Sequence, residues 1–430
     1  MTEVLIEKTD FLSGEVSAPP SKGYTHRAII ASSLSEYTSK IKKPLICDDT
    51  SATIDACRLL GAEIKVLNEY IEVTGRQRPL TPEDVIFCGE SGSTIRFLGP
   101  ICTLAPGISI LTGGSSLRNR PMAPMLEALT QLGVRCYSAR GDGRPPIIIF
   151  GGGLKGGRVR VCGDVSSQFI SGLLFAAPRA EDKVELSLTT RLNSKPYVDM
   201  TVDILSKCGV KVDCLPRERL FKVDSGQTYS PLDYEVEGDY SSAAFLLAAA
   251  ALVPSKVDVM GLRAESLQGD KVIIDLLREM GVSLRVAEDR VRVEGTGGYL
   301  KGLRFDASDT PDLVPVLMVL GCFAEGKTVI DGIGRLRWKE SDRTKALTSE
   351  LRKLRGKLNI YEDKVIVKGS HRLEGAEVNS HSDHRVAMAL AVAALASEGR
   401  TKILGFECVK KSYPNFIQDI LRIGGKLAVG

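Results

Sequence analysis

The sequence has few of the features that mark a secreted, membrane-bound or nucleic-acid-binding protein. Its 430 residues carry 57 Lys and Arg against 53 Asp and Glu, a formal net charge of only +4, and no block of like charges forms a binding tail. The N-terminus lacks the basic and then apolar layout of a signal peptide. The longest apolar stretch, residues 243–253, is too short to cross a membrane. We therefore expect a cytoplasmic protein of two or three domains, with neither a membrane nor a nucleic acid as partner.

Patterns that bind metals are also scarce. The chain has four histidines, none spaced as a helical His-x-x-x-His pair, and its ten cysteines form no Cys-x-x-Cys pair. A metal site made of His381, Asp383 and His384 is conceivable, but the sequence as a whole predicts no metal and no cofactor. Most cysteines lie beside apolar residues, which predicts buried, reduced thiols.

The chain repeats one layout six times, with a period of about 70 to 75 residues, far longer than that of a solenoid. In each copy an Ala-rich apolar helix follows a polar turn, and the turns lie near Lys22, Ser91, Ser166, Ser241, Thr310 and Ser382. A second, amphipathic helix then ends at or near a glycine, as helices commonly do. These second helices are expected at 53–61, 125–133, 198–209, 271–281, 343–356 and 415–424.

Alternating apolar and polar runs follow most of the second helices and predict β-hairpins, most clearly at residues 282–294. Duplication is supported because Gly163-Asp-Val-Ser-Ser167 recurs as Gly238-Asp-Tyr-Ser-Ser242. We expect an α/β protein of six βαβαββ units, with the Ala-rich helices buried and the second helices nearer solvent. The alternative is six unrelated helix pairs. Residues 226–231 are a candidate linker between domains.

One polar turn has the character of an anion site. Residues 18–34 pass from a Pro-Pro pair through a short turn into an apolar helix, and Ser21 is a plausible N-cap. The helix N-terminus offers free N–H groups and a positive dipole end, to which Lys22 and Arg27 add two cations. This arrangement favours a phosphate or a carboxylate, although a helix start with solvated charges would look the same.

Further polar turns lie beside the other apolar helices. Residues 88–96 form a small-residue turn that ends in a cation and lets a ligand approach backbone N–H groups, but it is not a Walker motif and could be a plain loop. Arg120 opens one helix and Ser166-Ser-Gln168 opens another, where simple capping is an alternative. Each turn is weak evidence when taken alone.

Residues 335–343 are the most charged segment and contain the only tryptophan. Glu340 stands among cations there, a combination that suits both anion binding and proton transfer. A solvated helix start with local ion pairs is the alternative. The charges of Asp383-His-Arg385 should be constrained in space, because they introduce an almost wholly apolar helix.

Together these turns match one family. The chain resembles 5-enolpyruvylshikimate-3-phosphate (EPSP) synthase along its whole length, and nine segments carry the resemblance in order. They are residues 20–27, 89–96, 118–121, 166–168, 194–197, 310–312, 338–343, 383–385 and 411–414. The sequence departs from the family's usual pattern at three positions: Gly23 replaces a serine, and Glu90 and Arg335 each replace an asparagine. These departures concern affinity more than reaction type.

The resemblance implies the two-domain enolpyruvyl transferase fold, an inside-out α/β barrel in each domain, built from three βαβαββ units with buried helices. One domain would span residues 19–230, and the other would join residues 1–18 to 231–430, with the active site in the cleft between them. It further implies that the chain, a monomer, moves the enolpyruvyl group of phosphoenolpyruvate to the 5-hydroxyl of shikimate 3-phosphate. This addition and elimination through a tetrahedral intermediate releases phosphate, needs no metal, and serves chorismate and aromatic amino-acid biosynthesis.

The resemblance also implies roles for individual residues. Asp312 and Glu340 would be the acid–base pair, with Lys22 as a third catalytic residue. Phosphoenolpyruvate would contact Lys22, Gly92, Arg120, Gln168, Arg343, Arg385 and Lys411. Shikimate 3-phosphate would contact Lys22, Gly23, Arg27, Ser166, Ser167, Gln168, Ser194, Tyr197, Asp312 and Lys339.

Two other functions compete with this reading. UDP-N-acetylglucosamine enolpyruvyl transferase shares the fold, but that family commonly has a cysteine in a Gly-rich mobile loop, and the region of residues 118–121 has none. The other alternative is a non-catalytic protein that binds anions or nucleic acid through its charged turns. The near-neutral charge and an aromatic content of only 6% argue against it.

Overall fold

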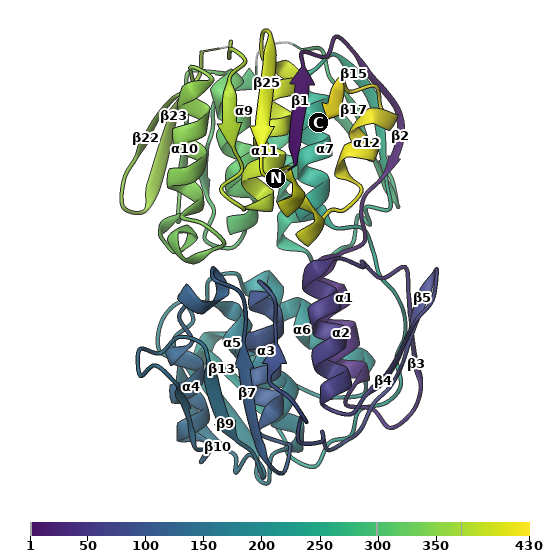
Figure 1. Ribbon diagram of the computed structural model, residues 1–430, viewed down its shortest axis with the longest axis vertical. Helices are drawn as coiled ribbons and strands as arrows, with labels where there is room; N and C mark the ends of the chain where they lie inside the picture. The colour runs from purple at the N-terminus through teal and green to yellow at the C-terminus, as the bar shows by residue number, and fades with distance from the viewer. Residues whose placement is uncertain (1, 298–299, 371) are drawn as a thin grey trace. The chain divides into compact units, whose positions relative to one another are not determined.

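The chain folds into two compact units in a computed structural model that describes residues 2–297, 300–370 and 372–430. Unit 1 comprises residues 1–20 and 237–430, and unit 2 comprises residues 21–236; Figure 1 labels their elements. The units divide at 20/21 and 236/237, whereas the sequence placed the boundaries at 18/19 and 230/231. Strand β14 (Asp233–Glu235) accounts for the later second boundary, because it pairs with β3 (Ser39–Lys42) of unit 2.

Each unit contains the same sheet three times, so the described residues form six four-stranded sheets and one two-stranded sheet. In every four-stranded sheet a parallel pair is extended by two antiparallel strands, as in the order β14-β3-β5-β4. In five of these sheets the two added strands are neighbours in the sequence and form a hairpin. The other strands of unit 2 are β4 (Glu63–Val66), β5 (Tyr70–Thr74), β6 (Ile86–Phe87), β7 (Ile108–Thr112), β8 (Cys136–Ser138), β9 (Ile147–Phe150), β10 (Gly157–Val161), β11 (Val184–Leu188), β12 (Asp213–Leu215) and β13 (Leu220–Val223). This recurrence confirms the predicted α/β repeat.

Unit 1 follows the same plan. Its strands are β1 (Glu3–Glu7), β2 (Leu12–Ser17), β15 (Ser255–Met260), β16 (Ser283–Val286), β17 (Arg290–Glu294), β18 (Leu300–Lys301), β19 (Arg304–Asp306), β20 (Ala324–Glu325), β21 (Lys327–Asp331), β22 (Lys357–Ile360), β23 (Lys364–Lys368), β24 (Glu377–Asn379), β25 (Arg400–Leu404) and β26 (Leu427–Val429). The predicted hairpin at 282–294 is the β16–β17 pair.

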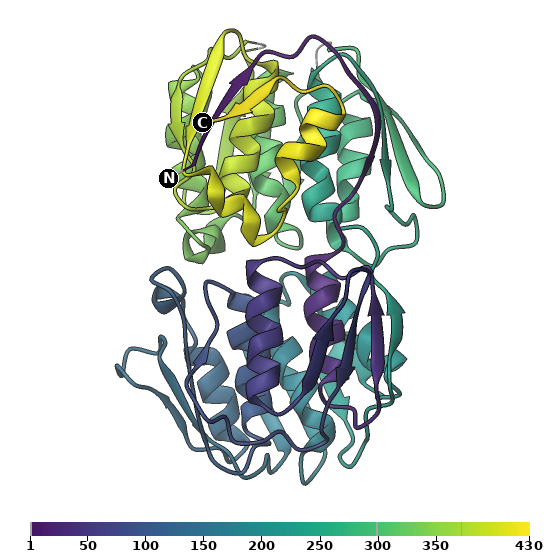
Figure 2. The ribbon, with the colours of Figure 1, turned by 45° about the vertical axis from the view of Figure 1, so that its right-hand side comes forward.

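The N-terminal segment completes unit 1. Strand β1 lies between β25 and β26 and pairs antiparallel with both, and β2 runs parallel to β15. In Figure 2 the purple N-terminal strand accordingly lies beside the yellow C-terminal elements. The sheet that contains β1 is therefore built from both ends of the chain, and the sheet that contains β2 draws its other strands from residues 255–294. Unit 2 is inserted between the two parts of unit 1.

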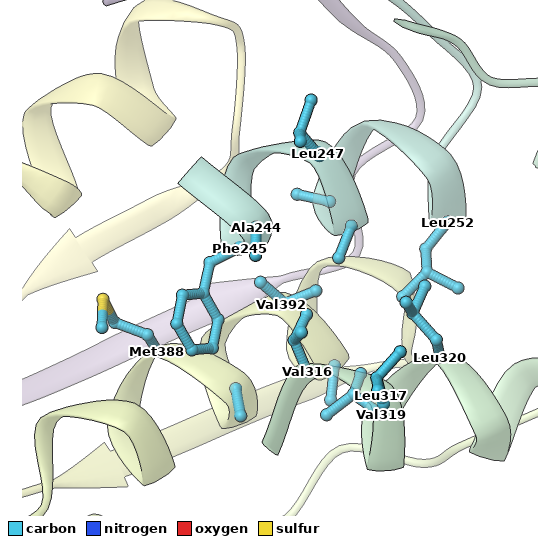
Figure 3. Packing of buried hydrophobic residues seen from close by; sticks show 14 of the residues in the cluster. Ala244, Phe245, Leu247, Leu252, Val316, Leu317, Val319, Leu320, Met388 and Val392 are labelled. Carbon is cyan, nitrogen blue, oxygen red and sulfur yellow. The ribbon is translucent and has the colours of Figure 1, made fainter. Parts of the chain in front are cut away.

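The first, apolar helices of the six repeats lie in the cores of their units, although, contrary to the expectation from the sequence, not all six are rich in alanine. They are α1 (Lys22–Ser32), α3 (Gly92–Cys102) and α5 (Ser167–Ala176) in unit 2, and α7 (Tyr240–Leu252), α9 (Val314–Phe323) and α11 (His384–Ala396) in unit 1. Every residue of α7 is buried. Figure 3 shows Phe245 of α7, Val316 of α9 and Val392 of α11 in one cluster. Small alanine side chains are plentiful in α7 and α11, whereas α3 and α9 contain none and pack with larger apolar side chains.

The second helices end as the glycines predict. They are α2 (Asp48–Leu59), α4 (Ala123–Gln131), α6 (Lys195–Lys207), α8 (Ile273–Glu279), α10 (Arg343–Lys353) and α12 (Phe416–Arg422). All but α10 are followed by a glycine with positive φ, the left-handed conformation that glycine adopts without strain. After α10 the left-handed residue is Arg355, with φ of 71°, and Gly356 follows it.

Three further sequence expectations can be compared with the structure. All ten cysteines are in the described part of the chain and are free; six are buried, three are partly buried and Cys214 is exposed. Residues 226–231 are not a linker, because the Tyr229 hydroxyl is buried and donates to the carbonyl of Phe175 at 2.7 Å, within unit 2. Among the described residues, no helix has both the length and the apolarity needed to cross a membrane.

Candidate functional site

Polar turns at the N-terminal ends of several unit 1 helices bring seven charged side chains together. We call this set the unit 1 cluster. It consists of Asp312, Lys339, Glu340, Arg343, Asp383, Arg385 and Lys411. Asp312 lies in the short helix η5 (Pro311–Leu313), Lys339 directly follows η6 (Gly334–Trp338), and Lys411 ends η7 (Phe406–Lys411). Arg343 begins α10, and Asp383 is the N-cap of α11.

Arg343 is the centre of the unit 1 cluster. Its side chain is only 2% exposed, and its Nη1 lies 3.0 Å from Asp312 Oδ1 while its Nε lies 2.9 Å from Asp383 Oδ2. Arg385 also contacts Asp312, with Nη2 at 3.1 Å from Oδ2, and Lys339 Nζ lies 3.4 Å from Oδ1 of the same carboxylate. The planar guanidinium of Arg343 thus joins two loops that are 71 residues apart in the sequence.

Glu340 is held between two cations. Arg343 Nη2 lies 2.6 Å from its Oε2, and Lys411 Nζ lies 3.1 Å from its Oε1. The Glu340 side chain is 10% exposed and that of Lys411 is 8% exposed. A carboxylate so placed is oriented on both oxygens, which suits a group that has to exchange a proton with a bound substrate.

Burial and neighbouring charges shift the pKa values of three residues of the unit 1 cluster, Asp312, Lys339 and Arg343. Burial alone would raise the pKa of Asp312, but Arg385, Lys339 and Arg343 hold it well below its ordinary value. Burial would lower the pKa of Arg343, yet the carboxylates of Asp383, Glu340 and Asp312 raise it. For Lys339 burial outweighs the attraction of Asp312 and lowers the pKa to about 8. Asp312 is therefore ionised, and Lys339 titrates near physiological pH.

Unit 2 carries a second set of polar helix ends. Lys22 Nζ, in the first turn of α1, lies 2.8 Å from Asp49 Oδ2 of α2. The hydroxyl of Thr94 in α3 donates to the Asp49 carbonyl at 3.4 Å, which brings the start of α3 to the same place. As predicted, Ser21 caps α1 by accepting from the backbone N–H of Tyr24.

Gly92 lies against two guanidinium groups. A Cβ atom at this position would stand 2.8 Å from Arg120 Nη1 and 3.2 Å from Arg96 Nη1. Arg96 Nη1 donates to Gln168 Oε1 at 2.8 Å, and Gln168 Nε2 donates to Ser93 Oγ at 2.8 Å. Three of the residues expected to contact phosphoenolpyruvate, Gly92, Arg120 and Gln168, are thus gathered at the N-terminal ends of α3 and α5.

Arg27 links α1 to α6 through protein atoms. Its Nη1 donates to the Gly23 carbonyl at 2.8 Å, its Nη2 to the Tyr197 carbonyl at 2.7 Å, and its Nε to Thr201 Oγ1 at 2.8 Å. Its side chain is buried, which lowers its pKa to about 10. These bonds make Arg27 a fixed cation whose remaining N–H groups are those that could reach an anion.

The expected hydroxyl ligands lie at the ends of two unit 2 helices. Ser166 is the N-cap of α5, where its Oγ accepts from the Gln168 N–H at 3.3 Å, and Ser167 follows it, buried. Ser194 is the N-cap of α6 and has φ of 56°, a left-handed conformation that a serine adopts only under constraint. Its carbonyl accepts from the Tyr197 N–H at 3.1 Å.

The structure shows what surrounds each of the three residues that depart from the family pattern. Gly23 lies beside Met200, whose Cε would stand 3.1 Å from a Cβ at this position. Glu90 accepts from the backbone N–H of Leu117 at 2.7 Å, so its charge orders the turn before Arg120. Arg335 donates through Nη2 to the carbonyl of Ser308. The two charged replacements thus support local loops within their own units.

Sequence reasoning left three of these residues out of the site. Asp49 partners Lys22, Arg96 orients Gln168, and Asp383 holds Arg343 while its Oδ1 caps the N–H of Arg385 at 2.9 Å. The sequence did indicate that Asp383 is constrained, because it is a charged residue directly before an almost wholly apolar helix. Among residues 2–297, 300–370 and 372–430, no group of three or more His, Cys, Asp or Glu side chains is arranged to hold a metal ion.

The fold defines the class of protein to which this chain is similar. It matches the structure of EPSP synthase from Acinetobacter baumannii with a TM-score of 0.83 and 27% identity, covering 100% of both chains. It also matches the enolpyruvyl transferase NikO from Streptomyces tendae with a TM-score of 0.82 over 100% of this chain and 99% of that one, but at 18% identity this likeness concerns the fold alone. The architecture is thus that of the enolpyruvyl transferases.

Sequence comparison identifies the family. Residues 6–420 match the model of EPSP synthase (3-phosphoshikimate 1-carboxyvinyltransferase). The 3-phosphoshikimate 1-carboxyvinyltransferase of Methanocaldococcus jannaschii is 44% identical over 430 residues, 99% of each chain. That of Methanocella arvoryzae is 44% identical over 425 residues, also 99% of each chain. The chain belongs to the EPSP synthase family, as its motifs predicted.

Proposed function

We propose that this chain transfers the enolpyruvyl group of phosphoenolpyruvate to the 5-hydroxyl of shikimate 3-phosphate and releases phosphate, as a step of aromatic amino-acid biosynthesis. Membership of the family over residues 6–420 supports the reaction type. The observation that carries the proposal is the pairing of Glu340 with both Arg343 and Lys411, which sets a proton-exchanging group among cations. Two substrates that each bear a phosphate and a carboxylate need such cations.

The proposed chemistry has two stages. In the addition the 5-hydroxyl oxygen bonds to C2 of phosphoenolpyruvate, the hydroxyl loses its proton, and the methylene carbon gains one. In the elimination the methyl group returns a proton and the bond between C2 and the phosphate oxygen breaks. Asp312 and Glu340 are the proposed acid–base pair, because Asp312 stays ionised among three cations and Glu340 is oriented on both oxygens.

We assign the binding residues unit by unit. In unit 1, Arg343, Arg385 and Lys411 would serve phosphoenolpyruvate, and Lys339 would serve shikimate 3-phosphate. In unit 2, phosphoenolpyruvate would contact Lys22, Gly92, Arg120 and Gln168. Shikimate 3-phosphate would contact Lys22, Gly23, Arg27, Ser166, Ser167, Gln168, Ser194 and Tyr197. Residues of both units would then act on one pair of substrates. The shared cleft, the cytoplasmic location and the monomeric state stay predictions. Analytical ultracentrifugation tests the monomeric state.

An exchange of the acceptor substrate tests the proposed function. The purified protein should form an enolpyruvyl ether, detected by mass spectrometry, from phosphoenolpyruvate and shikimate 3-phosphate. It should form none when UDP-N-acetylglucosamine replaces shikimate 3-phosphate. The opposite acceptor preference would assign the chain to the rival reaction. A lack of product with either acceptor would refute catalysis.

A further inference from the structure

A buried carboxylate at the end of α10 has no role in the reaction as described so far. Glu350 is 2% exposed, and its oxygens accept from Lys353 Nζ at 2.7 Å, the Asn379 N–H at 2.9 Å and His381 Nε2 at 2.9 Å. Burial alone would raise the pKa of Glu350, but the hydrogen bonds from Lys353, His381 and Asn379 keep it below its ordinary value. The carboxylate is ionised, so the His381 ring donates to it through Nε2.

His381 belongs to a strained turn. His381 has φ of 52° and the next residue, Ser382, has φ of 54°, so two successive residues with Cβ atoms are left-handed. Such residues persist only where the surroundings fix them. Here the backbone N–H of His381 is bound by Asn379 Oδ1 at 2.7 Å, and that of Ser382 by Ser380 Oγ at 3.2 Å. Glu350 thus contacts the turn formed by residues 379–382 at two points, the backbone N–H of Asn379 and the ring of His381.

The strained turn leads directly into the unit 1 cluster. The next residue is Asp383, which is fully buried and binds Arg343 Nε at 2.9 Å. Asp383 also caps α11 by accepting from the N–H of Arg385 at 2.9 Å. A change in the turn would therefore move Asp383, and with it the guanidinium groups of Arg343 and Arg385.

We infer that Glu350 and His381 are positioning residues for phosphoenolpyruvate binding: they hold the 379–382 turn in the conformation that aims Asp383 at Arg343. The inference rests on the proposed function, since Arg343 and Arg385 matter here as the cations that bind phosphoenolpyruvate. This role requires no contact between substrate and either Glu350 or His381. Their effect reaches the site only through the backbone of the turn and the carboxylate of Asp383.

The first test is Glu350→Gln, which keeps the shape of the side chain and removes its charge. We expect the KM for phosphoenolpyruvate to rise about tenfold, the effect of losing hydrogen bonds to a charged group. The KM for shikimate 3-phosphate should rise much less. Glu374→Gln is the matched control, because Glu374 is an exposed residue of unit 1 that pairs with Arg355 at 3.4 Å, and it should leave both KM values unchanged.

Two further variants separate positioning from folding. His381→Asn removes the ring donor but keeps a residue type that tolerates the left-handed region, so it should reproduce the selective rise in KM. Adding Ser382→Gly to Glu350→Gln removes the Cβ from one strained position, so it should restore the KM for phosphoenolpyruvate part of the way. The inference is overturned if the melting temperature falls while both KM values stay at wild type, or if both KM values rise equally.

Wild-type protein must be measured beside the variants. If the wild type forms no product, the proposed function fails, and calorimetric binding of phosphoenolpyruvate, which needs no turnover, decides on the positioning residues by itself. A Kd for phosphoenolpyruvate about tenfold higher in Glu350→Gln than in Glu374→Gln would support them. Equal Kd values would refute them.

Discussion

Arg343 Nη2 donates to Glu340 Oε2 across 2.6 Å, and the two residues are three positions apart at the start of α10. The same guanidinium reaches Asp312 at 3.0 Å and Asp383 at 2.9 Å. One buried cation therefore contacts both carboxylates of the proposed acid–base pair, while Lys411 adds a second ion pair to Glu340 and Arg385 adds one to Asp312.

Removing the acid at position 340 should impair chemistry more than binding. Glu340→Gln keeps the size of the side chain and its acceptor oxygen but cannot exchange a proton at useful rates. We expect kcat to fall about 10²- to 10⁴-fold, the range for loss of general acid–base catalysis. Phosphate release measures turnover, and calorimetry should show phosphoenolpyruvate still bound. A variant with wild-type kcat would remove Glu340 from its proposed role.

Removing the central cation should cost stability. Arg343→Ala leaves Asp383, which is 0% exposed, and Asp312 without the guanidinium that pairs with both. Breaking such a buried pair typically lowers the free energy of unfolding by about 3–5 kcal/mol. Arg304→Ala is the control, because Arg304 is 74% exposed and its pair with Asp331 should contribute less than about 1 kcal/mol. Equal losses in denaturant titrations of the two variants would contradict this account.

A methyl group at position 92 should disturb phosphoenolpyruvate binding. Gly92 is helical, so alanine is not strained there, but its Cβ would stand 2.8 Å from Arg120 Nη1 and force that guanidinium aside. We expect Gly92→Ala to lower kcat/KM for phosphoenolpyruvate about tenfold to a hundredfold, because small displacements of binding groups have effects of this size. The melting temperature should stay near that of the wild type. Steady-state kinetics with unchanged kcat/KM would show that Arg120 has no part in binding.

The lowered pKa of Lys339 predicts a pH dependence. Burial lowers the pKa of Lys339 to about 8, so the free protein loses this positive charge as the pH rises through 8. We expect kcat/KM for shikimate 3-phosphate to fall above about pH 8, because kcat/KM reports groups of the free enzyme. Lys339→Arg should move this fall to higher pH, since an arginine keeps its proton. The same alkaline fall in Lys339→Arg would assign the titration to another group.

Much of the fold could be predicted from the sequence because its signals are local. The glycines at 61, 133, 209, 281 and 424 do end second helices in the left-handed conformation. The apolar run from Ala243 to Val253 is also a local signal. It predicted a buried helix, because a helix without a polar face has to be covered by other parts of the protein.

Long-range pairing could not be predicted in this way. Val236 belongs to unit 2 because β14 pairs with β3, almost 200 residues earlier, and nothing within residues 231–236 indicates that partner. Likewise, the sequence places Asp383 before an apolar helix but does not say that Arg343 is its partner. The motif residues of the site were identified by resemblance, whereas Asp49 and Glu350 emerged only from their contacts.

The most direct test of the central claim is the substrate dependence of phosphate release. The claim is that one protein brings two acidic substrates together and breaks the bond to phosphate only when both are bound. Purified protein should release phosphate from phosphoenolpyruvate at a steady rate when shikimate 3-phosphate is present, and at the buffer rate when it is absent. Equal rates with and without shikimate 3-phosphate, or no release in either case, would contradict the account.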